Sequence, residues 1–178
     1  MNENNNLVVI ENGQLSVYEL DGKLSWEIGR LSKQNKPDIG LHSLTISRKH
    51  GKFENMDGLW FYIDYQGKNG TVYNNRKVTG GIHGRVRPLM LKDGDVFVFG
   101  GPVVSENTAW VLYSQNQMSV HWRVEDTKGL PLLSLAEGSS ITTLNNPALG
   151  TVIKKQNSIA IYMGNITYLC GNISLLTN

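Results

Sequence analysis

The sequence contains a single cysteine, Cys170, and only four histidines, which are widely scattered. One cysteine excludes a disulfide framework within the chain, and the scattered histidines argue against a zinc finger. No segment approaches the roughly 20 apolar residues of a membrane helix, and the polar start from Met1 to Asn6 does not fit a secretory signal. We therefore expect no membrane span and a cytoplasmic location. A chain of 178 residues can still bury a core without disulfides or a structural metal.

Charged residues are also scarce, at 18% of the chain, whereas an ordinary domain has about 25%. Glycine and asparagine are abundant instead, with 19 and 18 residues. Both tolerate positive φ, so they favour tight turns between short strands over helices. Apolar or alternating runs recur at intervals of roughly 8 to 12 residues, which is typical of an all-β fold.

The expected strands are short and are bounded by glycine, asparagine or aspartate. In the first part of the chain they are Leu7–Ile10, Gln14–Leu20, Trp26–Gly29, His50–Glu54, Leu59–Asp64, Thr71–Tyr73, Val96–Phe99 and Ala109–Tyr113. In the last part they are Val120–Val124, Ser139–Leu144, Ser158–Met163 and Tyr168–Cys170. Asn12-Gly13, Asp21-Gly22 and Asp57-Gly58 suit type I′ hairpin turns. Only Leu130–Glu137 is expected to form a short helix, with Pro131 in its first turn.

The net charge of +2 hides an uneven distribution. Residues 28–92 contain twelve basic and four acidic side chains, a local net charge of +8. The flanking segments 1–27 and 93–178 carry −4 and −2. Such a segment can simply be a solvated surface, but its basic residues lie in or beside expected loops, where backbone N–H groups can also bind an anion. The charge pattern therefore suggests an anion-binding site in the middle of the chain.

Four short motifs follow one another in and around this segment. They are Ile28-Gly29-Arg30, Leu44–His50, Gly67–Asn74 and Leu91–Gly100. Their order and spacing resemble the forkhead-associated (FHA) domain, whose pattern is Gly-Arg, Ser-x-x-His, Asn-Gly-Thr-x-x-Asn and a late Asp-Gly-Asp before an apolar strand. The resemblance covers residues 7–115. It implies an antiparallel β-sandwich that binds phosphothreonine peptides through its loops.

The resemblance also implies roles for single residues. Arg30, Ser47 and Arg48 would hold the phosphate, Lys68 would support it, and Asn69 would hydrogen-bond the peptide backbone. The chemistry fits, because an arginine offers a planar fork of donors to a phosphate and a serine offers its hydroxyl and an N–H. Lys68 stands where the family often has Ser or Thr, and it either strengthens the attraction for phosphate or is merely an exposed charge.

Five further motif residues are expected to have structural tasks. Gly29 and Gly70 should serve turns, His50 should brace the Ser47 loop by hydrogen bonds, and Thr71 and Asn74 should bond their loop to itself. Asn75 replaces the more frequent glycine, but asparagine also tolerates the left-handed region, so we expect the turn to persist.

The chain offers little for catalysis. It lacks the phosphate loop of nucleotide hydrolases, the Gly-x-Ser-x-Gly elbow and the His-Glu-x-x-His helix. Asp93 and Asp95 fit a turn that enters a strand, and Cys170 lies in an apolar stretch where a buried, inert thiol is expected. We therefore expect neither an enzyme nor a cofactor.

Nucleic-acid binding is an alternative, because the basic segment contains Trp60, Phe61, Tyr62 and Tyr65. Most of these belong to a continuous apolar run and should lie in the core, so we expect no nucleic-acid partner. A purely structural or oligomerising FHA fold is a second alternative. Arg30, Ser47 and Asn69 argue against it, because a structural sandwich has no need of all three.

The sequence thus predicts a phosphothreonine-dependent adaptor in Ser/Thr kinase signalling. Its partners would be phosphothreonine-containing proteins or peptides, namely substrates of Ser/Thr kinases, and it would form the N-terminal part of a larger bacterial protein. Residues 7–115 would be the FHA domain. Residues 116–178 would be a β-rich region, either an extension packed on the first domain or a truncated, degenerate FHA-like repeat.

Overall fold

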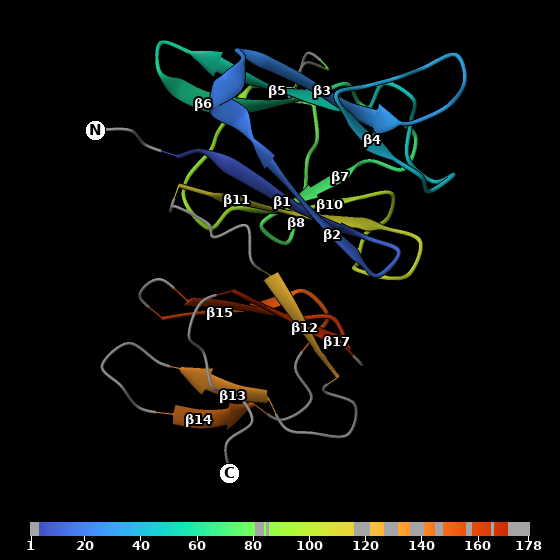
Figure 1. Cartoon of the computed structure of the whole chain (residues 1–178). Helices are drawn as coiled ribbons and strands as arrows, with labels where there is room; N and C mark the ends of the chain where they lie inside the picture. Colours follow the sequence, from blue (N-terminus) through green and yellow to red (C-terminus); the bar gives the residue numbers. More distant parts are fainter. Residues whose placement is uncertain are drawn as a thin grey trace. The chain divides into compact units, whose positions relative to one another are not determined.

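The computed structural model describes residues 4–80, 84, 86–115, 122–126, 132–135, 141–144, 148–155, 158–164 and 166–170 (Figure 1). The chain forms two compact units, residues 1–117 and 118–178. In the described residues, no helix has the length and apolar character needed to cross a membrane. The assignment of 7–115 and 116–178 as separate domains stays a prediction.

The first unit contains two sheets. One has the strand order β2-β1-β11-β10-β7-β8, and the other has the order β4-β3-β5-β6-β9. The strands of the first sheet are β1 (Asn6–Glu11), β2 (Gln14–Glu19), β7 (Thr71–Tyr73), β8 (Arg76–Lys77), β10 (Val96–Phe99) and β11 (Ala109–Ser114). Those of the second are β3 (Ser25–Arg30), β4 (Ile39–Leu41), β5 (Gly51–Met56), β6 (Leu59–Asp64) and β9 (Leu89–Met90). A 3₁₀ turn (Leu20–Gly22) leads from one sheet to the other.

The two sheets share one hydrophobic core. Strand β6 shows how the sequence builds it, because Trp60 and Tyr62 are buried while Phe61 between them is only half-buried. The ring of Phe97, from β10, lies 5.6 Å from the ring of Phe53 and 4.9 Å from that of Tyr62, both in the other sheet. Such aromatic pairs add specific edge-to-face contacts to the burial of apolar area. The expected all-β, antiparallel sandwich is confirmed, with β3 and β4 as a parallel pair within it.

Most expected strands are present, three of them with the expected bounds: β6, β7 and β10. The short strands β4, β8 and β9 were not expected. The predicted helix is wrong, since Leu132–Leu135 is strand β13 and pairs with β14 (Ile141–Leu144). A short apolar run fits either element, and the pairing partner decides between them. Leu130, Pro131, Ala136 and Glu137 lie outside the described residues.

The predicted type I′ turns differ in outcome. Asn12 and Gly13 have φ of 53° and 71°, and Asp57 and Gly58 have φ of 54° and 85°, as a type I′ turn requires. The prediction for Asp21-Gly22 is wrong, because this pair lies in the 3₁₀ turn. There the chain passes between sheets instead of folding back on one strand.

The second unit contains the sheet β12-β17-β16-β15 and the pair β13-β14. The strands not yet given are β12 (Trp122–Asp126), β15 (Thr151–Lys155), β16 (Ser158–Tyr162) and β17 (Ile166–Cys170). Ile161, Tyr168, Leu169 and Cys170 are buried in this unit, so the thiol is enclosed as expected. Its interpretation as an FHA-like repeat stays a prediction.

Candidate functional site

Strand pairing brings the motif loops to one end of the first unit. Thr71 of β7 pairs with Phe99 of β10, which pairs with Ala109 of β11. The loops of residues 65–70 and 100–108 therefore emerge at the same end. Residues 42–49, between β4 and β5, join them there through hydrogen bonds to both loops.

The 42–49 loop is held by Glu11 of β1 and by Asn107 of the 100–108 loop. The carboxylate of Glu11 in β1 accepts hydrogen bonds from the backbone N–H of His42, at 2.8 and 3.0 Å, and of Ser43, at 3.0 Å. The hydroxyls of Ser43 and Thr45 donate to the carbonyl of Asn107, at 2.7 and 2.8 Å. Sequence reasoning missed these contacts, since they join residues 31 to 64 positions apart.

Arg30, the last residue of β3, lies directly beside this loop. Its backbone N–H donates to the carbonyl of Ser47 at 3.0 Å, and its Nη1 donates to the carbonyl of Leu44 at 3.0 Å. A guanidinium has five N–H donors, so most remain available for a ligand. In the part of the chain that the structure describes, no carboxylate pairs with Arg30.

Asn69 and Ser47 come from different loops but lie in one place. Nδ2 of Asn69 donates to the carbonyl of Thr45 at 2.6 Å. Gly67 lies so close to Ser47 that an added Cβ would stand 2.3 Å from its hydroxyl oxygen. The structure thus brings together Arg30, Ser47 and Asn69.

Arg48 and Lys68 are the two expected phosphate-binding residues with exposed cationic side chains. Among the described residues, neither cationic group has a hydrogen bond or an ion pair. The carbonyl of Arg48 accepts a bond of 2.8 Å from Nδ2 of Asn35, which also donates to the carbonyl of Arg30 at 2.9 Å. Asn35 therefore ties two site residues together, although no motif drew attention to it.

A buried polar network lies beneath the loops. His50 is fully buried, its Nδ1 accepts from the backbone N–H of Ser47 at 3.2 Å, and its Nε2 lies 3.0 Å from the carbonyl of Gly70. Since Nδ1 is an acceptor, Nε2 carries the proton. Burial lowers the pKa of His50 and outweighs the opposing effects of Asp64 and of the hydrogen bond to Gly70. The lowered pKa favours the neutral ring.

The network extends from His50 to a carboxylate. Thr71 Oγ1 lies 2.9 Å from His50 Nε2 and donates to Asp64 at 2.6 Å, and the hydroxyl of Tyr62 donates to the same oxygen at 2.7 Å. Ser47, His50 and Asp64 are the residue types of a hydrolase triad, but the arrangement differs. His50 binds the backbone of Ser47 instead of its hydroxyl, and both ring nitrogens are engaged inside the core.

Two expected structural roles are wrong in detail. Gly29 lies within β3 and not in a turn, and an added Cβ would stand 1.9 Å from the carbonyl oxygen of Arg48. Its missing side chain lets the Ser47 loop approach the strand. Asn74 does not bond its own loop, because its side chain donates to Asp95 at 3.0 Å and accepts from Val96 N–H at 2.8 Å. Asn74 and Asn75 have φ of 47° and 68°, so the expected turn is confirmed.

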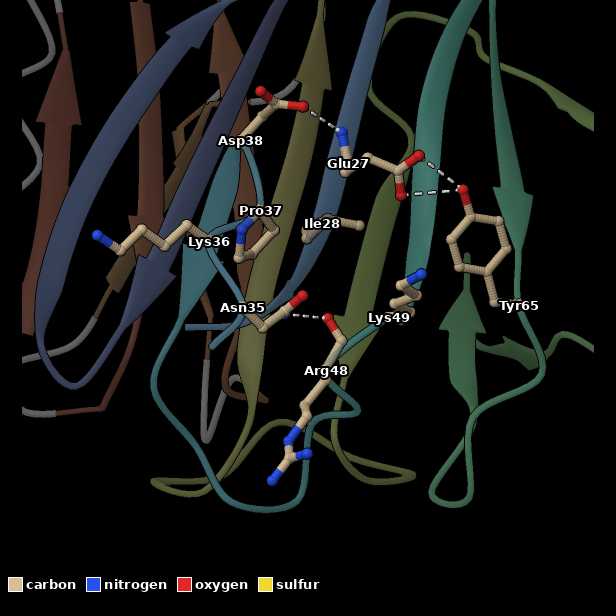
Figure 2. Close-up of a pocket in the computed structure, with 9 residues that line it drawn as sticks. All are labelled: Glu27, Ile28, Asn35, Lys36, Pro37, Asp38, Arg48, Lys49 and Tyr65. Atoms are coloured by element: carbon tan, nitrogen blue, oxygen red, sulfur yellow. Dashed lines mark hydrogen bonds between the residues drawn. The ribbon is translucent and has the colours of Figure 1, made fainter. Parts of the chain in front are cut away.

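The aromatic residues of β6 are poorly placed to stack on bases. Trp60 and Tyr62 are buried, and only Tyr65, beyond the end of the strand, is exposed. The hydroxyl of Tyr65 donates to both carboxylate oxygens of Glu27, at 2.8 and 2.9 Å (Figure 2). A row of exposed aromatic rings, which a single-strand binder needs, is not formed by these residues.

The first unit is a β-sandwich with exposed cationic side chains in the loops at one end and the buried polar groups of His50 and Asp64 beneath them. Exposed loops on a rigid sandwich are typical of an interaction module. Residues 26–100 match the model of the family described as "FHA domain", so the chain carries an FHA domain. An FHA domain is an interaction module and not an enzyme.

Solved structures with a similar fold include full-length yeast Pml1p, with 24% identity and a TM-score of 0.51 over 62% of this chain and 81% of that one. A second structure of the yeast Pml1 splicing factor has 24% identity and a TM-score of 0.50, covering 62% and 78%. The N-terminal FHA domain of S. cerevisiae Rad53p, in complex with a phosphothreonine peptide, has 23% identity and a TM-score of 0.47, covering 62% and 94%. No curated protein matches the chain.

Proposed function

We propose that the FHA domain of this chain binds proteins or peptides phosphorylated on threonine. Arg30, Ser47, Arg48, Lys68 and Asn69 make the contacts. The observation that carries the proposal is the convergence of Arg30, Ser47 and Asn69 at one end of the sandwich, beside cations without a carboxylate partner in the described part of the chain. Loops on a rigid scaffold are a frequent location for binding residues.

The chemistry of the three residues suits a phosphate monoester next to a peptide backbone. Arg30 uses one guanidinium donor for Leu44 and offers the others to the phosphate oxygens. Ser47 offers a hydroxyl from a backbone position that His50 and Arg30 both hold. Asn69 uses one amide N–H for Thr45, so its second N–H and its carbonyl can pair with the backbone of an extended peptide.

Arg48 and Lys68 add charge around this centre. The guanidinium of Arg48 extends towards the loops, while its backbone faces Asn35 (Figure 2). Because both side chains are exposed, salt screens their attraction for phosphate. We therefore assign them a supporting contribution, smaller than that of Arg30.

The test is a phosphothreonine peptide library measured by fluorescence anisotropy against the wild type and Arg30→Ala. A charged hydrogen bond contributes about 1.5–3 kcal/mol, so the variant should bind roughly 10- to 150-fold more weakly. Arg76→Ala is the matched control, because this exposed arginine follows the Asn74-Asn75 turn, at the opposite end of β7 from Thr71. Undiminished binding by Arg30→Ala, or equal binding of unphosphorylated peptides, would contradict the proposal.

The partners proposed for the module are substrates of Ser/Thr kinases, since such kinases produce phosphothreonine. Proteins captured from a lysate by the wild type and not by Arg30→Ala should be lost after phosphatase treatment. Capture that survives this treatment would exclude phospho-dependent signalling. The position of the module at the front of a larger bacterial protein stays a prediction.

A further inference from the structure

In the described part of the first unit, the two sheets have four edges, which differ in length. Three of them are formed by β4, β8 and β9, which have only two or three residues each, and both residues of β8 are basic. The fourth edge is β2, which has six residues, none of them buried, and contains no proline and no positive charge. Very short edge strands, proline and lysine are common means by which proteins keep a sheet from pairing with a further strand. The β2 edge has none of these, so it is open to pairing.

The pairing of β2 with β1 determines which of its backbone groups face the open edge. The two strands pair along the whole length of β2. Directly beyond it, the backbone N–H of Leu20 donates to the carbonyl of Asn5 at 2.8 Å, so these two residues form a hydrogen-bonded pair. Hydrogen-bonded and non-hydrogen-bonded pairs alternate along antiparallel strands, so the even-numbered residues of β2 bond β1. The backbone N–H and C=O groups of the odd-numbered residues point to the open edge, where no described strand pairs with them, namely those of Leu15, Val17 and Glu19.

We propose that β2 pairs with β2 of a second copy of this chain, antiparallel and around a two-fold axis at Ser16. Residues that oppose each other on neighbouring strands lie on the same face of the sheet, so Leu15 must oppose an odd-numbered residue of the second copy. With the axis at Ser16, Leu15 opposes Val17 of the second copy, and the outward backbone groups of these two residues bond each other. Both side chains are apolar and half-buried. An axis at Val17 would instead place Leu15 against the charged Glu19, which is less favourable.

The contact is self-complementary, as a two-fold axis requires. Glu19 is the only charged residue of β2, and in this register it opposes Gly13 of the second copy, so no like charges meet. The same edge serves both copies, and the association therefore ends at two chains. Strand β2 contains none of the residues proposed to bind phosphothreonine. Because the axis reverses the strand direction, the dimer has two ligand ends that point in opposite directions.

The test measures the mass of the full chain by sedimentation equilibrium over a wide range of concentrations. Ser16→Lys places two positive charges directly against each other at the axis. Gln14→Lys is the matched control, because it adds the same charge at another exposed position of β2, which opposes Tyr18 of the second copy.

Ser16→Cys gives an independent measurement of the register. The two copies of residue 16 form a non-hydrogen-bonded pair, whose Cα atoms lie about 4.5 Å apart, and this distance is within the range of a disulfide. Gln14→Cys is the control, because its two copies do not oppose each other. The native Cys170 is buried, so it does not compete for the cross-link.

We expect the wild type to change from monomer to dimer as its concentration rises, because a single pair of edge strands makes a small interface. Ser16→Lys should weaken the dimer about fivefold, whereas Gln14→Lys should associate like the wild type. Under mild oxidation with copper phenanthroline, Ser16→Cys should form a cross-linked dimer and Gln14→Cys should not.

A wild type that stays monomeric overturns the inference and leaves the β2 edge to a strand of a different protein. A dimer whose affinity is unchanged in Ser16→Lys, or equal cross-linking of Ser16→Cys and Gln14→Cys, overturns it as well. Urea denaturation of each variant shows that it is folded. Since no phosphopeptide enters the experiment, its failure leaves the proposed function intact.

Discussion

The loops at the end of the sandwich and the buried residues beneath them use their polar groups in opposite ways. At this end, Arg30 of β3 and the loop residues Arg48 and Lys68 have cationic groups without a carboxylate partner among the described residues. Beneath them, the buried side chains of His50 and Asp64 are bonded to several neighbours each.

The difference separates the residues that are proposed to bind the phosphate from the buried residues that hold the loops in place. A donor that is to hold a phosphate must be free of other anions, whereas a buried polar group without a partner costs free energy. Changes in the network should therefore act on the free energy of unfolding, and changes in the loops should act on affinity. The following predictions test this division, from the largest expected effect to the smallest.

Gly29→Ala should be the most damaging substitution. The new Cβ would stand 1.9 Å from the carbonyl oxygen of Arg48, and a backbone atom cannot give way cheaply. We expect the free energy of unfolding to fall by about 3 kcal/mol, measured by urea denaturation. Gly22→Ala is the control, because nothing lies within 4 Å of its added Cβ. Equal stability of the two variants would show that the strand and the loop do not need this close approach.

Thr71→Val should lower stability by about 1–2 kcal/mol while leaving the loop donors in place. The substitution keeps the shape of the side chain but removes the hydroxyl that bonds Asp64 and His50 in the core. Thr79→Val, at an exposed threonine, should change stability by less than about 0.5 kcal/mol. A large loss of phosphopeptide affinity without loss of stability in Thr71→Val would break the separation of support from binding.

Acid should destabilise the first unit through His50. Burial lowers the pKa of His50 in the folded state, so the unfolded chain takes up the proton first as the pH is lowered through 6.5. We therefore expect the free energy of unfolding to decrease as the pH is lowered from 7 to 5.5. His50→Gln should have a shallower pH dependence than His42→Gln, the control at an exposed histidine. Parallel pH profiles of the two variants would contradict the assignment.

Asn35→Ala should give the smallest change in stability and a measurable change in affinity. Its side chain holds the carbonyls of Arg30 and Arg48 from a partly exposed position. We expect phosphothreonine peptides to bind Asn35→Ala about threefold more weakly than the wild type. Gln34→Ala, at the exposed neighbouring residue, is the control and should keep the wild-type affinity. Wild-type affinity in Asn35→Ala would show that the loops keep their positions without this link.

Local features of the sequence predicted much of this structure. Leu59–Asp64 forms a strand with the expected bounds, and Asn12-Gly13 forms the expected turn, because both depend on neighbouring residues alone. Arg30, Ser47 and Asn69 were expected in one site from the family resemblance, and the loops bring them together.

Features that depend on distant partners could not be predicted. Leu132–Leu135 fits a helix or a strand until its pairing with β14 is known. Asp21-Gly22 has the composition of a hairpin turn, but the chain must change sheets there. Asp64 and Asn35 belong to no recognised motif, and only the three-dimensional arrangement shows that they support His50 and Arg48.

The attachment of the 42–49 loop has a consequence for the order of folding. Glu11 and Asn107, which hold the loop, both lie outside the segment 26–100 that matches the FHA family. Contacts across 31 to 64 residues form only after long segments of chain have been closed, which is slow relative to local turns. We therefore expect the loop to acquire its final shape late, after β1 and the 100–108 loop are in place. A fragment limited to residues 26–100 would contain every motif residue and still lack both anchors.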